Sequence, residues 1–486
     1  MGKYCHSTIV LLRSRSPVVH KLTLSQIAQI VGGQLFGDGN LLISGITTDS
    51  RSVARGDLFC AIVGSRINGH DCIEAATTAG AVAGLVSQQV SGPHVLVPES
   101  LDGDPVVAAL AKIATHVRAS MKNIEVIGIT GSSGKTSTKD MIGQVLANAG
   151  KTHAPAGSLN NELGLPLTIL SAPDGLRFLV TEMGMRGMNQ ITYLCNIAFP
   201  TIGVITNVGQ AHLGEVGSVE NIAKAKSELV KALPDDGVAI LNADDPQVMA
   251  MQTMTKATVF SYGFATDADV RAEQISITPR GTYTFDLIYR GNRVATSLPF
   301  LGLHNISNVL AAAAVGISVG MELEDIAGAI ADLKQMSKWR MEVHQVSNDV
   351  TVINDAYNAN PESVAAALLT LSSIPAAGAT WAVLGKMHEL GESSDKLHAQ
   401  IADLASELGI SHLVAVGESA RAYGLESAMS SGANAVWLPD FQAATDYIVN
   451  GVNSGDVLLF KASRAEQFEL LAKEVEDRLQ TKWSQQ

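Results

Sequence analysis

The chain has few cysteines and no long apolar run, and each shortage excludes a class of protein. Its cysteines, Cys5, Cys60, Cys72 and Cys195, lack the spacing of metal ligands, so free thiols in a reducing compartment are expected. No apolar stretch approaches the about 20 residues that span a bilayer. We therefore expect a cytoplasmic protein without membrane insertion.

The first 20 residues do not change this expectation. They hold a short apolar stretch, Ile9 to Leu12, between basic residues. This stretch is shorter than the apolar core of a signal peptide. Residues 1–20 are interpreted as an extension in front of the first domain.

Positive charge is also scarce, since the net charge is −13. This argues against an extended nucleic-acid surface, although phosphate can still be held locally. Hydrophobic residues make up 46% of the chain and charged residues only 17%, so a large core is expected and global disorder is not. A length of 486 residues indicates two to four domains.

The most informative stretch is Ile124 to Asp140. An apolar β-prone run, Val126 to Ile129, is followed by a loop of Gly and Ser, and then by Lys135, Thr136 and a helical pattern. A strand, a Gly-rich loop and a helix N-terminus together form a phosphate site, because backbone N–H groups and the helix dipole point at the anion. The alternative is an ordinary strand-to-helix turn.

The glycines of this loop are Gly128, Gly131 and Gly134, and Ile129 stands where the common P-loop has Gly. The pattern GITGSSGKT resembles the ATP loop of the Mur ligases. The resemblance implies ATP and Mg²⁺, with two ions expected, and a Lys that reaches the phosphates. It also implies nucleotide contacts from the whole loop, namely Gly131, Ser132, Ser133, Gly134, Lys135, Thr136 and Ser137.

Further motifs in the same order extend the resemblance over residues 21 to about 475. It implies an α/β protein of three domains. Residues 1–102 would form a small α/β domain that binds the UDP-sugar, and residues 103–336 a central ATP-binding domain with a mostly parallel sheet. Residues 337–486 would form a Rossmann-like ligase domain, but the dinucleotide fingerprint is missing and NAD is not expected. Closure about linkers near residues 102 and 336 would bring the substrates together.

In the first domain the landmark is Thr48-Asp49-Ser50-Arg51. An Asp-Ser-Arg sequence is typical of a turn. The alternative is a binding loop in which Ser50 and Arg51 contact phosphate. By the resemblance, these two residues contact the nucleotide-sugar.

In the central domain, strand patterns recur at Phe178–Thr181, Ile202–Thr206 and Val238–Leu241. Ligands bind at the carboxyl ends of parallel strands, so the polar residues that follow each strand should converge. They are Glu182, Asn207 to His212, and Asn242 to Asp245. Glu182 suits Mg²⁺ as an oxygen ligand, and the alternative is a helix-capping Glu.

Lys226 lies on the apolar stripe of a helix, four residues after Ile222 and four before Val230. Such a Lys either snorkels to water or is chemically special. It stands 14 residues after His212. In most Mur ligases a lysine at this distance is carbamylated and binds a second Mg²⁺ with the His. The resemblance therefore implies metal ligation by Thr136, Glu182, His212 and a carbamylated Lys226; a structural His212 is the alternative.

Two later motifs concern the nucleotide. Residues Asp269 to Leu298 alternate in hydrophobicity, which predicts an antiparallel excursion. After it, Gly302-Leu303-His304-Asn305-Ile306-Ser307-Asn308 runs into an Ala-rich helix. Asn at this point is normally a helix cap. The resemblance instead places Asn305 and Asn308 beside the adenine.

The last domain opens with Ser337-Lys338-Trp339-Arg340. By the resemblance, Arg340 reaches the ATP phosphates and Asp355 helps to bind the nucleotide. Substrate contacts are implied for Asn160, Asn161, Asn358, Asn360 and Ser363. For the whole stretch Asn354 to Ser363, a turn before a Pro-led helix is the alternative. Trp339 and Ala462 stand where the family usually has Gly, and Lys386 stands where Asp is common.

The form Asp355-Ala356-Tyr357-Asn358-Ala359-Asn360-Pro361 resembles the branch that joins D-alanyl-D-alanine to UDP-N-acetylmuramoyl-tripeptide. That implies an ATP-dependent amide ligase that uses an acyl phosphate and serves peptidoglycan synthesis, and hence cell shape and division. A monomer is expected. The alternatives are a sister ligase with another acceptor and a nucleotide-dependent scaffold without turnover. An NTP-driven motor is disfavoured.

Overall fold

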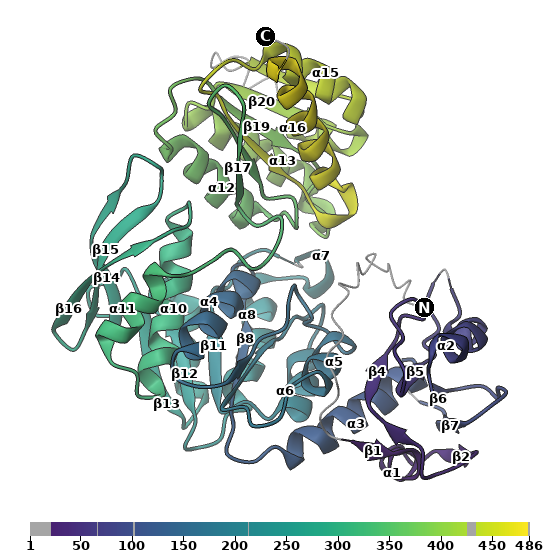
Figure 1. Ribbon diagram of the computed structural model, residues 1–486. Coiled ribbons are helices and arrows are strands. Elements are labelled where there is room, and N and C mark those ends of the chain that lie inside the picture. Colours follow the sequence, from purple (N-terminus) through teal and green to yellow (C-terminus); the bar gives the residue numbers. More distant parts are fainter. Residues whose placement is uncertain (1–20, 66, 101–102, 212, 425–433, 485–486) are drawn as a thin grey trace.

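The computed structural model describes residues 21–65, 67–100, 103–211, 213–424 and 434–484. Three α/β units follow one another along the chain (Figure 1), and the central unit contacts both of the others. Within the described residues, every helix is too short or too polar to cross a membrane.

The first unit is a five-stranded sheet in the order β2-β7-β6-β5-β4. β2 is antiparallel to β7 and the other neighbours are parallel. A separate strand pair, β1 with β3, lies beside α1. The elements are β1 (Leu22–Thr23), α1 (Leu24–Val31), β2 (Gln34–Phe36), β3 (Leu42–Ile43), β4 (Gly45–Thr47), β5 (Asp57–Cys60), α2 (Ile73–Ala79), β6 (Ala83–Val86) and β7 (His94–Leu96).

The central unit holds a nine-stranded sheet in the order β16-β15-β14-β13-β12-β11-β8-β10-β9. Its strands are β8 (Glu125–Thr130), β9 (Thr152–His153), β10 (Phe178–Glu182), β11 (Ile202–Ile205), β12 (Val238–Asn242), β13 (Thr258–Gly263), β14 (Val270–Ile277), β15 (Tyr283–Tyr289) and β16 (Asn292–Leu298). The helices are α3 (Pro105–Ser120), α4 (Lys135–Ala147), α5 (Gly164–Leu170), α6 (Gln190–Ala198), α7 (Leu213–Val216), α8 (Val219–Lys231), α9 (Pro246–Met249), α10 (His304–Ser318) and α11 (Leu323–Ala331).

Buried residues of β8 alternate between the two faces of this sheet. Val126 packs with the core formed by α3, α5, α6 and α8. Ile127 and Ile129 pack with the core formed by α4, α10 and α11. Strands buried on both faces read as apolar runs, which is why Val126 to Ile129 is recognisable in the sequence.

The predicted antiparallel excursion is confirmed, since β14, β15 and β16 pair antiparallel. Arg290 and Gly291 connect β15 to β16, with φ of 49° and 80°. Positive φ at both turn residues matches the twist of a two-residue hairpin.

The last unit is a six-stranded sheet in the order β17-β18-β22-β19-β20-β21, in which only β17 is antiparallel to its neighbour. Helices α12 and α13 cover one face and α15 and α16 the other. The elements are β17 (Glu342–Val346), β18 (Val350–Asn354), α12 (Pro361–Ser373), β19 (Thr380–Leu384), α13 (Ser394–Glu407), β20 (His412–Val416), β21 (Asn434–Leu438), α15 (Phe441–Gly451), β22 (Val457–Lys461) and α16 (Phe468–Ser484). The predicted α/β class with mostly parallel sheets is confirmed.

Candidate active site

The Gly-rich loop joins the carboxyl end of β8 to the first turn of α4. Gly131 has φ of 155° and Gly134, the N-cap of α4, has φ of 78°. A Cβ on Gly131 would lie 1.8 Å from Thr206 Oγ1, and one on Gly134 would lie 2.6 Å from Asn308 Oδ1. Both positions therefore require glycine, because the loop backbone lies directly against the side chains of Thr206 and Asn308. Ser137 follows in the first turn of α4.

The segment after β11 braces this loop. Ser133 N–H donates to Asn207 Oδ1 at 2.9 Å, and Asn207 Nδ2 donates to Ser133 Oγ at 2.9 Å. Thr206 Oγ1 donates to the Ser133 carbonyl at 2.6 Å, and Gly209 N–H donates to Ser132 Oγ at 2.8 Å. The polar residues of two strand ends thus converge, as the parallel sheet predicts.

Lys135 folds back over the loop. Its Nζ donates to the Gly131 carbonyl at 2.6 Å and to the Ser132 carbonyl at 3.4 Å. Burial lowers the pKa of Lys135; Glu182 opposes this shift and Arg340 adds to it. The ammonium group is therefore held at the point where the loop would receive phosphate.

Glu182, the last residue of β10, faces the first turn of α4. Its side chain is 1% exposed, and Thr136 Oγ1 donates to its Oε2 at 2.8 Å. Asn160 Nδ2 donates to Oε1 at 2.7 Å. A hydroxyl and a carboxylate side by side form an all-oxygen donor set, which fits Mg²⁺. Among the helices that the structure describes, none is capped by Glu182, so the capping alternative is wrong.

Arg340 reaches the same place from the segment before β17. Its Nη2 donates to Thr136 Oγ1 at 2.9 Å, and its Cζ lies 4.2 Å from the centroid of the Tyr357 ring. Its Nε is buried and has no hydrogen-bond partner among the described residues. The structure thus brings Thr136, Glu182 and Arg340 together from three distant segments.

Sequence reasoning missed Ser158. Its Oγ lies 3.1 Å from Thr136 Oγ1 and 3.4 Å from Arg340 Nη2. It follows β9, a two-residue strand that pairs parallel with β10. Ser158 therefore obeys the same rule of converging strand ends, but β9 is too short to be recognised from periodicity.

Lys226 is buried on α8 among side chains with no exposed surface, and is itself 1% exposed. The snorkelling alternative is therefore wrong. Burial, and secondly the positive charge of Lys135, hold the pKa of Lys226 well below its usual value. His212 lies outside the described residues, so its proposed pairing with Lys226 stays a prediction.

Asn305 and Asn308 both lie in α10 and are buried. Asn305 Nδ2 donates to the Leu301 carbonyl at 2.8 Å, and Asn308 Nδ2 donates to Asn305 Oδ1 at 3.0 Å. Thr138 Oγ1 donates to Asn308 Oδ1 at 3.2 Å. Leu303 is the N-cap of α10, so the alternative of Asn305 as the cap is wrong. This pair therefore supports α4 and the adjoining Gly-rich loop.

The predicted residues of the last unit lie around the start of α12. Asp355 Oδ2 pairs with Lys461 Nζ at 2.5 Å, and its Oδ1 accepts from Met341 N–H at 3.0 Å. Asn360 and Ser363 form a capping box: Ser363 N–H donates to Asn360 Oδ1 at 2.8 Å, and Asn360 N–H donates to Ser363 Oγ at 3.0 Å. Asn358 is exposed.

Several predicted contacts lie apart from this cluster. Arg51 pairs with Asp49 at 2.8 Å, and its side chain is 83% exposed on the first unit. Ser50 lies in the same turn. Asn161 Oδ1 accepts from Gly164 N–H at 2.8 Å, at the start of α5. Within the described residues, neither Ser50 nor Arg51 forms a hydrogen bond or ion pair with the Gly-rich loop.

The polar residues that follow β12, Asn242 to Asp245, form hydrogen bonds to neighbouring loops. Asn242 Nδ2 donates to the Thr206 carbonyl at 2.8 Å, and Asp245 Oδ2 accepts from Val208 N–H at 2.7 Å. Asp244 accepts from Phe264 N–H at 2.8 Å. Asn242 and Asp245 thus support the segment after β11, and Asp244 supports the turn after β13.

Glu362, in the first turn of α12, was also missed. Its Oε1 accepts from Gln210 N–H at 2.6 Å. Its Oε2 is buried without a hydrogen-bond partner in the described part of the chain. The last unit therefore touches the segment that braces the Gly-rich loop, a contact between residues that are distant in sequence.

Trp339, where the family usually has Gly, keeps a left-handed backbone with φ of 57°, and Met341 has φ of 51°. The Arg464 guanidinium lies 4.5 Å from the centroid of the Trp339 ring. The bulky residue thus adopts the conformation that favours Gly, and its ring is packed.

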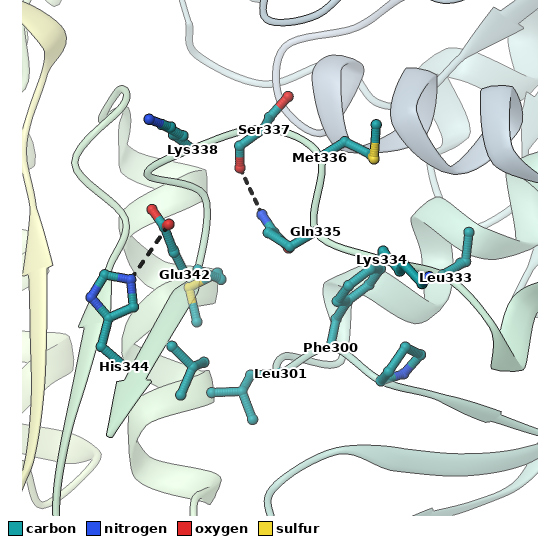
Figure 2. A pocket seen from close by; sticks show the side chains of 13 residues that line it. Phe300, Leu301, Leu333, Lys334, Gln335, Met336, Ser337, Lys338, Glu342 and His344 are labelled. Carbon is teal, nitrogen blue, oxygen red and sulfur yellow. Dashed lines mark hydrogen bonds and ion pairs between the residues drawn. The ribbon is translucent and has the colours of Figure 1, made fainter. Parts of the chain in front are cut away.

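A hollow of about 570 Å³ lies beside this segment (Figure 2). It is lined by residues 299–301, 333–338 and 341–344. Among its lining residues, Gln335 Nε2 donates to the Ser337 carbonyl at 2.8 Å, and His344 Nε2 lies 3.4 Å from Glu342 Oε1. The residues that surround Thr136 do not line this hollow, so it is separate from the candidate active site.

Three Mur ligase family models match the chain: "Mur ligase family, catalytic domain" over residues 42–126, "Mur ligase middle domain" over 129–316, and "Mur ligase, glutamate ligase domain" over 339–464. Together they cover more than half of the sequence. The chain belongs to the Mur ligase family.

Among its relatives is the UDP-N-acetylmuramoyl-tripeptide–D-alanyl-D-alanine ligase of Mycobacterium tuberculosis H37Rv, which is 40% identical over 92% of this chain and 96% of that protein. The protein of the same name from Bacillus subtilis is 33% identical over 94% of this chain and 98% of its own length.

Solved structures of MurF proteins superpose on this chain over most of its length. A crystal structure of MurF from Acinetobacter baumannii superposes with a TM-score of 0.85 at 29% identity, covering 95% of this chain and all of that one. MurF from Thermotoga maritima, in complex with ADP, gives a TM-score of 0.77 at 28% identity, covering 90% of this chain and 98% of that chain.

Proposed function

We propose that this chain is an ATP-dependent ligase that joins D-alanyl-D-alanine to UDP-N-acetylmuramoyl-tripeptide in peptidoglycan precursor synthesis in the cytoplasm. One observation carries the proposal: Thr136, Glu182 and Arg340 converge at the mouth of the Gly-rich loop. The relative that is 40% identical and bears this activity in its name supports the choice of substrates.

In the first step, a carboxylate oxygen of the tripeptide attacks the γ-phosphorus of ATP. The bond from that phosphorus to the β,γ-bridging oxygen breaks, giving an acyl phosphate and ADP. Loop N–H groups and Lys135 would hold the phosphates, and Arg340 would stabilise the transferring group. The rest of the nucleotide would be positioned by Asp355 and by the pair Asn305 and Asn308. The two Asn side chains would do so indirectly, because they support the loop.

Thr136 and Glu182 would hold a divalent cation, because their oxygens lie 2.8 Å apart and no positively charged side chain is ion-paired with Glu182 among the described residues. When bound, such an ion neutralises developing charge on the phosphates and the carboxylate. His212 and Lys226 would serve a second ion if Lys226 is carbamylated.

The burial of Lys226 supports this modification. A lowered pKa increases the fraction of the Lys226 amine that is neutral, and a neutral amine adds to CO₂ to form a carbamate with release of one proton. The product carries negative charge, which removes the repulsion between Lys226 and Lys135 and supplies oxygen ligands.

In the second step, the dipeptide amine attacks the acyl carbon and inorganic phosphate leaves from the tetrahedral intermediate. The enzyme contributes mainly by positioning the reactants. Ser50 and Arg51 of residues 1–102 would bind the nucleotide-sugar. Asn160, Asn161, Asn358, Asn360 and Ser363 would face the peptide substrates. Residues 103–336 would bind ATP and residues 337–486 the dipeptide, and we expect a monomer.

Phosphate release from ATP tests the proposal, with UDP-N-acetylmuramoyl-tripeptide and a panel of amino acids and dipeptides. Turnover with D-alanyl-D-alanine and not with single amino acids is expected. Turnover only with a free diamino acid on the shorter UDP-dipeptide would identify a sister ligase. No turnover with any pair would favour a nucleotide-dependent scaffold.

A further inference from the structure

Glu362, in the first turn of α12, uses only one of its two carboxylate oxygens. Its Oε1 accepts from Gln210 N–H at 2.6 Å. Its Oε2 is buried, and no group that the structure describes donates to it. Both oxygens of a carboxylate are hydrogen-bond acceptors, and a buried acceptor without a donor is destabilising. Oε2 therefore marks a place where we expect a donor that the chain itself does not supply.

The positively charged side chains that follow or end β22 are paired with other residues. Lys461 pairs with Asp355 and Arg464 pairs with Glu469, each at 2.5 Å. Glu362 itself has no ion-pair partner in the described ranges. A cation that pairs with its Oε2 must therefore arrive with a ligand.

The start of α12 limits where this carboxylate can lie. Asn360 caps the helix, and its capping box with Ser363 closes the first turn. Ser463 Oγ donates to the Ala359 carbonyl at 3.2 Å, which ties this turn to the segment after β22. The N-terminus of a helix also favours negative charge. Because Asn360 and Ser363 bond each other, Glu362 is the charged side chain of this turn that stays available to a ligand.

One stretch of backbone separates Glu362 from the Gly-rich loop. Gly209 N–H donates to Ser132 Oγ at 2.8 Å, and a Cβ on Gly209 would lie 2.7 Å from Glu362 Cδ. Gly209 thus contacts both the loop and the carboxylate. In the proposed reaction the acyl phosphate forms beside this loop, and the acceptor approaches from the last unit. Glu362 therefore lies close to the place where the two reactants meet.

The acceptor of the proposed reaction carries the kind of donor that Oε2 lacks. The amino group of a dipeptide is mostly an ammonium at neutral pH. An ammonium has three N–H donors and forms strong, charge-assisted hydrogen bonds with a carboxylate. A metal ion would need further ligands, and within the described residues Glu362 belongs to no cluster of three His, Cys, Asp or Glu side chains that could hold one. The observations therefore favour the ammonium.

We propose that Glu362 Oε2 binds the ammonium group of the acceptor dipeptide and so fixes the amine beside the acyl phosphate. This inference rests on the proposed function, because the acceptor is the one that the proposed reaction uses. Oε1 keeps its bond to Gln210, so a single carboxylate joins the acceptor to the segment next to the Gly-rich loop. Glu362 thus selects acceptors that have a free, positively charged amino group.

Steady-state kinetics of the full chain with Glu362→Gln test the role of the charge. The variant keeps an oxygen for Gln210 N–H but carries no negative charge. We expect the KM for D-alanyl-D-alanine to rise about tenfold or more, since a charge-assisted hydrogen bond is lost. The KM for ATP and the KM for UDP-N-acetylmuramoyl-tripeptide should stay within about twofold of the wild type, because neither substrate contacts Oε2.

Hydroxylamine as the acceptor separates substrate binding from a structural role. It is a small amine that is mostly uncharged at neutral pH, and it attacks the acyl carbon of the acyl phosphate to give a hydroxamate and inorganic phosphate. Because it brings no ammonium, the wild type and Glu362→Gln should form the hydroxamate at rates within about twofold of each other. A variant that merely disturbed the Gly-rich loop would slow the reaction with both acceptors alike.

The matched control is Glu324→Gln, because Glu324 is an exposed acidic residue in the first turn of another helix, α11. It should behave as the wild type does with both acceptors. The ligand offers a second control. N-acetyl-D-alanyl-D-alanine has no ammonium, so its inhibition constant should be the same for the wild type and for Glu362→Gln.

An unchanged KM for D-alanyl-D-alanine in Glu362→Gln would overturn the inference, and so would equal slowing with D-alanyl-D-alanine and hydroxylamine. N-acetyl-D-alanyl-D-alanine that bound the wild type as tightly as D-alanyl-D-alanine does would refute it without any variant. If the wild type uses D-alanyl-D-alanine and Glu362→Gln matches it, only the inference fails. If the wild type forms product with no acceptor, the proposed function fails and the inference fails with it.

Discussion

At the scale of single residues, Lys226 is the side chain whose chemistry depends most on its surroundings. Its helix buries it beside a second lysine, Lys135, and both burial and repulsion disfavour the charged ammonium. A group with a strongly perturbed pKa next to a ligand site is a candidate for special chemistry. The proposed carbamylation would replace this unfavourable positive charge with a negative one.

Lys226→Ala should lower the rate of phosphate release by about a hundredfold or more, because the proposed carbamate would be an electrostatic part of the site. Adding bicarbonate should raise the activity of CO₂-depleted wild-type protein. Nuclear magnetic resonance with ¹³C-bicarbonate should show a carbamate signal in the wild type and none in Lys226→Ala.

Short carboxylates such as formate should partly rescue Lys226→Ala. The matched control is Lys224→Ala, a change two residues away on the same helix, at a position that is not buried. It should keep both the carbamate signal and the activity. Full activity of Lys226→Ala without bicarbonate or carboxylate would remove the carbamate from the mechanism.

At the scale of structural elements, the segment 337–341 combines a strained backbone with packed side chains. Trp339 and Met341 both have positive φ on either side of Arg340. The backbone of Trp339 is held by hydrogen bonds: its N–H donates to Glu342 Oε2 at 3.0 Å, and its carbonyl accepts from Tyr357 N–H at 3.1 Å. The conformation that aims Arg340 is therefore imposed by its neighbours.

Trp339→Ala should destabilise the protein by about 1 kcal/mol more than Trp339→Gly. Both variants lose the stacking with Arg464, but Ala keeps the left-handed strain that Gly avoids. Urea denaturation of the two variants measures the difference. Lys338→Ala, at the exposed neighbouring position, should stay within about 0.5 kcal/mol of the wild type. Equal stability of the two Trp339 variants would show that this backbone is unstrained.

The start of α12 raises a different question, because Asn360 is both a helix cap and a predicted substrate contact. Asn360→Ala should cost about 1 kcal/mol, since it removes the acceptor for Ser363 N–H. Asn360→Asp keeps that acceptor and should keep the stability. Thermal unfolding and the KM for D-alanyl-D-alanine, measured on both variants, separate the two roles. Unchanged KM in Asn360→Asp would leave Asn360 as a cap only.

Elements with a strong pattern were predictable from the sequence. β10 (Phe178–Glu182) and β12 (Val238–Asn242) begin where the predicted strands Phe178–Thr181 and Val238–Leu241 begin, and each runs one residue further. Apolar runs and helical spacing involve only residues that are close in sequence. They can therefore be recognised without knowing how the units pack. The two-residue β9 has no period to detect, and the positive φ of Trp339 is set by contacts with Glu342 and Tyr357.

The residues of the candidate site likewise divide into those that the sequence predicted and those that it did not. Thr136, Glu182 and Lys226 follow from strand ends and a helix stripe, together with the family resemblance. Ser158 and Glu362 were missed because their partners are distant in sequence: Ser158 meets Arg340, and Glu362 meets Gln210. Such pairs depend on how the units pack, which periodicity does not encode.

At the scale of the whole molecule, the last unit is docked on the central one through several polar contacts. Glu362 accepts from Gln210 N–H, Arg186 pairs with Glu389 at 3.5 Å, and Gly214 N–H donates to the Glu389 carbonyl at 3.3 Å. Figure 1 shows α7 at this junction. These contacts bring α12 to the segment that braces the Gly-rich loop, so docking and the geometry of the site are coupled.

His304, the first residue of α10, makes this docking dependent on pH. Burial lowers the pKa of His304 to about 4, with Asp355 opposing the shift and Lys461 of the last unit adding to it. Between pH 6.5 and 4 the unfolded chain therefore binds more protons at this residue than the folded one. The stabilisation is complete above pH 6.5 and is lost as the pH falls toward 4.

The difference in unfolding free energy between the wild type and His304→Gln should therefore change by about 2 kcal/mol between pH 7 and pH 5, because Gln does not titrate. Urea denaturation followed by tryptophan fluorescence measures it, since all four tryptophans, Trp339, Trp381, Trp437 and Trp483, lie after residue 336 and report on the last unit. The subtraction cancels the carboxylates that titrate in the same range. A difference that is constant with pH would mean that His304 keeps an ordinary pKa, and that acid weakens docking through other groups.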